Sequence, residues 1–81
     1  MDALDGNAIA GPLAEVFGTE MTTATGICIS CGRSSQVAGF AVYLQGPGIV
    51  ARCGGCAAVL MVLVEIRGMT CVDLRGLSSL G

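Results

Sequence analysis

The chain has 81 residues, of which 53% are hydrophobic and 12% are charged, and its formal net charge is −2. This length allows one domain, in which a hydrophobic core alone gives marginal stability and a metal ion or an oligomer contact often adds to it. The acidic balance and the absence of Lys argue against a nucleic-acid partner, because phosphate binding needs clustered basic side chains. We therefore expect a single domain whose apolar surplus is either buried or in contact with a partner.

No stretch of the sequence has the features of a targeting or membrane-spanning segment. Residues 1–5 contain two acidic residues and no basic one, whereas a secretory signal begins with positive charge. The longest unbroken apolar run, residues 57–64, is far shorter than a bilayer span. We therefore expect a cytoplasmic protein that has no membrane partner.

Residues 4–17 have the spacing of an amphipathic helix. Asp5 is a suitable N-cap, and Gly18 permits the left-handed turn that often ends a helix. Pro12 lacks an amide donor and crowds the preceding turn, so a kink or two short helical pieces are expected. The apolar residues that recur at intervals near 3.6 are Leu4, Ala8, Ile9, Leu13, Val16 and Phe17.

The middle of the chain predicts antiparallel strands. The β-branched stretch at residues 20–27 predicts a first strand that leads to the first cysteine. Residues 36–45 alternate with a two-residue period and predict a second strand. Residues 46–48 then predict a hairpin turn, and residues 49–52 predict the returning strand.

The last third of the chain predicts a buried strand and its neighbour. Residues 57–67 are apolar on both faces, so we expect a central strand with the helix covering one of its faces. Gly68 permits a tight turn, and residues 69–74 predict the last strand. Residues 75–81 are expected to be a short tail that frays.

Two Cys-X-X-Cys hooks are the strongest signal in the sequence: the first hook is residues 28–31 and the second is residues 53–56. Cys31 and Cys53 are separated by 21 residues, close to the roughly 15 to 20 that is typical of a paired zinc site. Two intervening residues let both sulfurs of a hook face inwards, so two hooks supply a tetrahedron of thiolates. The sequence therefore predicts one metal site, with Zn²⁺ as its first candidate, whose ligands are Cys28, Cys31, Cys53 and Cys56.

The spacing leaves other uses of the four thiolates open. A rubredoxin-type iron site has the same ligands, although such proteins usually pack the metal in an aromatic core. The aromatic residues of this chain are only Phe17, Phe40 and Tyr43. Disulfides need an oxidising compartment, and a redox-active pair needs a thioredoxin-like frame. Zinc is therefore the first hypothesis, and iron is the alternative.

Small residues at the hooks favour a tight turn around a metal. Gly32 directly follows the first hook, and Gly54 and Gly55 lie within the second, where they let backbone amides approach the sulfurs. Ala57 stands where a second glycine is expected, which predicts a less regular turn at that hook.

The remaining residues argue against enzyme chemistry. With no His in the chain, neither a His-bearing catalytic zinc site nor a His-activated nucleophile can be formed. Four cysteine ligands also leave no open position for water or substrate. Cys71, the fifth cysteine, is expected to be a small buried thiol. Arg33 and Arg52 flank the hooks and are expected to offset the negative charge of the site.

The chain also resembles a family of small bacterial proteins of about this length that is described as a domain of unknown function. The resemblance is carried by residues 4–17, residues 21–26, residues 59–76 and the two hooks. It implies that the four hook cysteines are metal ligands. It also implies a partner in an oxidoreductase system, such as a ferredoxin-reductase-like protein.

These observations combine into one interpretation of residues 1–81. We expect a single small α+β domain in which residues 20–76 form a zinc-ribbon-like antiparallel sheet, stapled by the metal, with the helix of residues 4–17 packed on it. The expected function is that of a non-enzymatic zinc ribbon that serves as a protein-interaction or accessory module. The alternative is a rubredoxin-like mono-iron electron carrier serving an oxidoreductase, and the third hypothesis is a nucleic-acid-binding zinc ribbon. A homo-oligomer is compatible with each.

Overall fold

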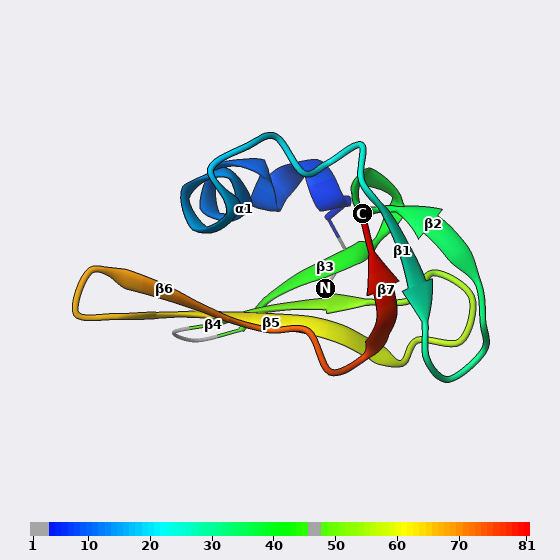
Figure 1. The fold of residues 1–81 in the computed structure, drawn as a ribbon. Coiled ribbons are helices and arrows are strands. Elements are labelled where there is room, and N and C mark those ends of the chain that lie inside the picture. Colours follow the sequence, from blue (N-terminus) through cyan, green and yellow to red (C-terminus); the bar gives the residue numbers. More distant parts are fainter. Residues whose placement is uncertain (1–3, 46–47) are drawn as a thin grey trace.

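The computed structural model describes residues 4–45 and residues 48–81. It contains an N-terminal helical segment, a three-stranded antiparallel sheet of order β2-β1-β7, and a four-stranded antiparallel sheet of order β3-β4-β5-β6 (Figure 1). The predicted small α+β class is confirmed, although the strands are divided between two sheets. In chain order, the elements are η1 (Gly6–Ile9), α1 (Ala10–Phe17), β1 (Thr25–Cys28), β2 (Ser34–Gln36), η2 (Val37–Gly39), β3 (Ala41–Gln45), β4 (Gly48–Arg52), β5 (Val59–Ile66), β6 (Met69–Asp73) and β7 (Leu77–Leu80).

The helical segment has two pieces, the 3-10 helix η1 and the α-helix α1. The Asp5 carboxylate caps η1 by accepting a hydrogen bond from the Asn7 amide at 3.0 Å. Pro12 lies in the first turn of α1, where a missing amide donor costs no intrahelical hydrogen bond. Gly18 ends α1 with a φ of 72°, and its amide donates to the Ala14 carbonyl at 2.8 Å. The prediction of two helical pieces with these ends is confirmed.

Strand β5 lies between β4 and β6 in the four-stranded sheet, which confirms its predicted central place. The β5–β6 hairpin closes through Arg67 and Gly68, which both have positive φ, as in the two-residue turns that suit the twist of a hairpin. Strands β3 and β4 pair along their whole length, from Ala41 opposite Arg52 to Gln45 opposite Gly48. Residues 46 and 47 of the predicted turn lie outside the described residues, and Gly48 begins β4.

The C-terminal residues form strand β7, so the prediction of a frayed tail was wrong. Strand β7 pairs with β1, and the backbones of Thr25 and Gly81 exchange two hydrogen bonds of 3.0 Å. Leu77 lies over Gly26, because a Cβ added to this glycine would be only 2.9 Å from the Leu77 side chain. Leu77 and Leu80 also pack against the core. These contacts, which join residues far apart in the sequence, hold the tail in place.

Two predicted strands are shorter than expected. Residues 20–24 precede β1 without being part of it, and the Glu20 carboxylate accepts hydrogen bonds there from the amide and hydroxyl of Thr22, at 2.6 and 2.5 Å. The predicted strand at residues 36–45 is interrupted by η2, which brings Val37 into the core. In both places, local hydrogen bonds and burial outweigh the β propensity of the sequence.

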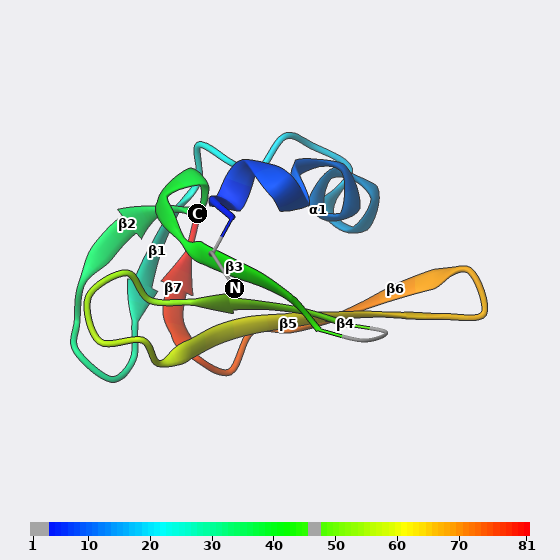
Figure 2. The same cartoon turned by 180° about the vertical axis from the view of Figure 1, so that it is seen from behind.

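The helical segment lies over one face of the four-stranded sheet (Figure 2). The core is formed by buried side chains from both, and Cys28 of β1 joins it. Ile9 and Leu13 of the helical segment are fully buried. Met61 and Leu63, which project from the same face of β5, are also buried. The predicted packing of the helix on one face of the central strand is therefore confirmed.

Gly76 lies where the chain passes from the four-stranded sheet to the three-stranded one. Its amide donates to the Leu60 carbonyl at 3.2 Å, and its carbonyl accepts from the Ile29 amide at 2.9 Å. A Cβ at this position would lie 1.9 Å from the carbonyl oxygen of Val59, so backbone would have to move. We expect Gly76→Ala to lower the free energy of unfolding by about 1–3 kcal/mol, as overpacking does, when measured by urea titration.

Gly11 provides the control, because nothing lies within 4 Å of a Cβ added there. Gly11→Ala replaces a glycine within α1 and should raise the free energy of unfolding by about 0.5–1 kcal/mol. Equal unfolding midpoints for Gly76→Ala and the wild type would contradict the close contact between the sheets.

Candidate metal centre

Each hook is the turn between two neighbouring strands: the first connects β1 to β2, and the second connects β4 to β5. The Gly32 amide donates to the Cys28 carbonyl at 2.9 Å, and the Ala57 amide donates to the Cys53 carbonyl at 3.0 Å. The amide of each hook's first cysteine also donates to the carbonyl five residues later, at 2.9 and 2.8 Å. The two hooks therefore form the same backbone turn, one in each sheet.

The residue after each hook adopts a left-handed backbone conformation. Gly32 has a φ of 75° and Ala57 has a φ of 63°. The second turn therefore matches the first, although the alanine predicted a less regular one. The Arg52 guanidinium donates to the Ala57 carbonyl at 2.8 Å and braces this turn. The sequence placed Arg52 beside the hook but did not indicate this contact, which depends on a chain reversal between the two residues.

The four hook cysteines point their sulfurs at one another. All four Sγ atoms lie within 4.8 Å of one another, and two pairs across the hooks, Cys28 with Cys56 and Cys31 with Cys53, are 3.7 Å apart. Four sulfurs placed tetrahedrally at the usual Zn–S distance of about 2.3 Å are about 3.8 Å from one another. The arrangement fits a single metal ion at the centre of the four sulfurs.

The site lies at the protein surface, half inside the core and half outside it. Cys28 and Cys53, the first cysteine of each hook, are buried and belong to the hydrophobic core. Cys31 and Cys56 are exposed. A metal held here would border the hydrophobic core on one side and face solvent on the other.

Backbone amides favour the thiolate form of the two buried cysteines. The amides of Cys56 and Gly55 lower the pKa of Cys53 from its ordinary value of 9.0 to about 6, and the Gly55 nitrogen lies 3.3 Å from the Cys53 sulfur. The Cys31 amide lowers the pKa of Cys28 in the same way, against the opposing effect of burial. Fewer protons must therefore be displaced when a metal binds near neutral pH.

The crowding of four sulfurs has the opposite effect on Cys31. The Arg33 amide favours its thiolate, but the neighbouring thiols, that of Cys56 first, together with burial outweigh this and raise the pKa of Cys31 to about 11. Negative charge on one sulfur opposes ionisation of the next, and a divalent cation between them removes this opposition. The donor set therefore suits a thiophilic cation.

Arginine side chains lie against the second hook. A Cβ at Gly55 would meet the Arg33 side chain at 3.1 Å, so this glycine leaves room for the arginine to cross from the first hook. Arg52 reaches the backbone beyond the same hook, as described above. Both arginines therefore lie beside the second hook, and their role in offsetting the charge of bound thiolates stays a prediction.

Cys71 lies apart from the candidate centre and is exposed, so the prediction of a buried thiol was wrong. Its neighbour in the register is Val64, on the face of the sheet that α1 does not cover. Within residues 4–45 and 48–81, the hook cysteines are the one group of three or more Cys, Asp or Glu side chains that converges as metal ligands do.

The model of a protein family described as "Family of unknown function (DUF6510)" matches residues 1–81. The chain belongs to this family. The comparisons with curated proteins and with solved structures found no match. Among the described residues, no helix of this family member is long and apolar enough to cross a membrane.

The two left-handed positions predict a reciprocal pair of substitutions. Ala57→Gly removes the steric cost of an alanine at positive φ, whereas Gly32→Ala introduces it. The entropy of the unfolded chain changes in the opposing direction and offsets part of each effect. We therefore expect the free energy of unfolding to rise by about 0.5–1 kcal/mol in Ala57→Gly and to fall by about 0.5–1 kcal/mol in Gly32→Ala. Thermal unfolding of the metal-loaded variants measures both, and shifts of the same sign would contradict the equivalence of the turns.

The hook cysteines and Cys71 should respond differently to replacement. Cys53→Ser leaves three thiolates, so we expect loss of bound metal and of cooperative unfolding, because metal-binding energy is then lost from folding. Cys71→Ser should keep both the bound metal and cooperative unfolding. Elemental analysis and circular dichroism measure the two properties. A Cys53→Ser variant with wild-type metal content and melting temperature would contradict the site.

Proposed function

We propose that this chain is a non-enzymatic zinc-ribbon module that binds another protein, and that its zinc is structural. The observation that carries the proposal is the convergence of Cys28, Cys31, Cys53 and Cys56 on one point. Four protein sulfurs complete a tetrahedral coordination sphere and leave no position for a water nucleophile or a substrate. The metal would then hold the fold together and take no part in a reaction.

Exposed apolar side chains support the protein-binding role. Val16 and Phe17 at the end of α1 are 41% and 38% exposed, although the rest of the helix is anchored by buried Leu13. Large apolar side chains that remain in contact with water at the end of an ordered helix favour contact with a partner. The net charge of −2 gives no attraction for nucleic acid, which disfavours a nucleic-acid-binding ribbon.

One alternative has its own supporting observation. Cys31 and Cys56 are exposed, and the Gly55 amide donates toward the Cys53 sulfur. A surface-accessible metal whose thiolates accept amide hydrogen bonds is also what a mono-iron electron carrier needs. Such a carrier would fit the oxidoreductase partner implied by the resemblance. The two metals differ visibly, because ferric thiolate absorbs visible light and zinc thiolate does not.

The proposed function is tested by isolating the protein from its native host with its complexes intact. We expect a colourless protein that retains a second polypeptide in stoichiometric amount. Phe17→Glu should keep the metal and lose the polypeptide, whereas Glu15→Gln, at another exposed position of α1, should keep both. A red protein that contains iron would support the electron carrier, and a zinc protein that retains no other polypeptide would contradict the protein-binding role.

A further inference from the structure

The four-stranded sheet has a second face, which α1 does not cover. Figures 1 and 2 show the helix on one side of β4, β5 and β6 only. Side chains alternate along a strand, so Val62, Val64 and Ile66 project opposite the core-facing Met61 and Leu63 and share this second face. The register between β4 and β5 shifts between Ala51 and Arg52, so Val59, which is opposite Arg52, joins this face, whereas Leu60 is buried. We call it the open face. Its described apolar residues are Ala41, Tyr43, Val50, Val59, Val62, Val64, Ile66, Met69 and Cys71, and its charged residues are Arg52 and Asp73.

The open face is apolar and in contact with water. None of its residues is buried, whereas Val42, Ala51, Met61 and Leu63 on the other face are. An antiparallel sheet with one solvated face normally has polar residues there. A continuous apolar sheet face of this kind indicates a site that another molecule covers.

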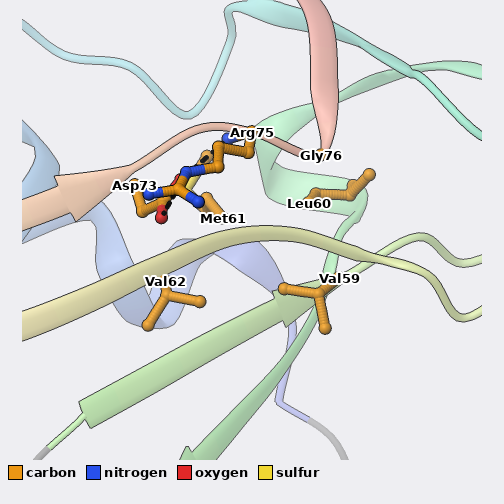
Figure 3. A pocket seen from close by; sticks show the side chains of 7 residues that line it. All are labelled: Val59, Leu60, Met61, Val62, Asp73, Arg75 and Gly76. Carbon is orange, nitrogen blue, oxygen red and sulfur yellow. Dashed lines mark hydrogen bonds and ion pairs between the residues drawn. The ribbon is translucent and has the colours of Figure 1, made fainter.

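The two ends of the open face have complementary shapes. At the tip of the β5–β6 hairpin, Ile66 and Met69 project with 54% and 70% of their surface exposed. At the opposite end, where β6 stops pairing and leaves β5, there is a hollow of about 260 Å³ (Figure 3). This hollow is lined by four consecutive residues of β5 and by three from the end of β6 and the segment after it: Val59, Leu60, Met61, Val62, Asp73, Arg75 and Gly76. The same face thus carries a projecting apolar tip and an apolar hollow.

We propose that a second copy of this chain covers the open face, in a symmetric dimer whose two sheets pack face to face. The twofold axis lies between the sheets, perpendicular to β5 and near Leu63. It places Val62 of one copy over Val64 of the other, because these residues lie on either side of Leu63. It also places the hairpin tip of each copy over the hollow of its partner. Met69, which lies next to β5 at the hairpin tip of one copy, then fills the hollow of the other copy. Ile66 of one copy contacts Val59 of the other.

The charges and the size of the face agree with self-association. Asp73 is already paired with Arg75 at 3.2 Å, and Arg52 is turned to the Ala57 carbonyl, so two copies bring no unpaired like charges together. The four strands contain five, five, eight and five residues. At about 3.4 Å per residue and about 4.8 Å between strands, their flat footprint is about 375 Å². Two such footprints amount to about 750 Å², and the projecting side chains add to this, which places the interface near the lower limit of about 1,000 Å² for a specific interface.

The dimer is tested on the purified, metal-loaded protein, so its outcome is independent of the partner required by the proposed function. Light scattering at micromolar concentration should give twice the 8.1 kDa mass of one chain. Ile66→Glu should weaken dimerisation about 100-fold or more, because it places an unpaired charge inside the interface. Leu44→Glu is the matched control, since Leu44 is 53% exposed but faces the other side of the sheet. It should remain a dimer.

Cys71 reports which surface is covered. It is exposed in the single chain but lies on the open face, so iodoacetamide should modify it slowly in the wild type and at least about tenfold faster in Ile66→Glu. Peptide mass spectrometry separates its modification from that of the hook cysteines. A monomeric wild type would overturn the proposal. So would a dimer that survives Ile66→Glu, or equal modification of Cys71 in the two proteins.

Discussion

The structure depends on the convergence of four sulfurs from two separate sheets. Each sheet contributes one hook, and each hook reverses the chain through the same set of backbone hydrogen bonds. The three-stranded sheet is small, and a β-sheet of this size needs packing or a further constraint for stability. A metal at this point would supply that constraint, because it would fix the end of β1 against the end of β4. Gly76 provides a second connection between the sheets, through backbone contacts.

The chemistry of the site follows from the same convergence. Amides at the hooks stabilise the Cys53 and Cys28 thiolates, whereas the mutual proximity of the sulfurs disfavours ionisation of Cys31. Both effects favour a bound thiophilic cation. Because the protein provides all four ligands, the remaining surface of the domain is free for binding. The apolar side chains at the end of α1 and those of the open face lie on opposite sides of the sheet, so the proposed partner and the proposed second copy would not compete for the same surface.

The sequence predicted those features that depend on local spacing. The hooks, the Asp5 cap, the division of the helix near Pro12 and the central place of β5 all follow from neighbouring residues. It did not predict contacts between distant residues. Strand β7 exists because Leu77 and Leu80 pack on β1 and the core, and nothing in the serine-containing tail itself indicates this. The exposure of Cys71 was missed because strand alternation gives two faces but does not say which one the helix covers.

The central claim is that four cysteines hold one zinc ion and thereby join the two sheets. X-ray absorption at the metal edge, on protein purified from its native host, tests it most directly. The account predicts zinc, at one ion per chain, surrounded by four sulfur atoms at about 2.3 Å. A protein without metal, or a first shell that contains oxygen or nitrogen, would contradict the account. An iron edge with four sulfurs would retain the site but replace the structural role with electron transfer.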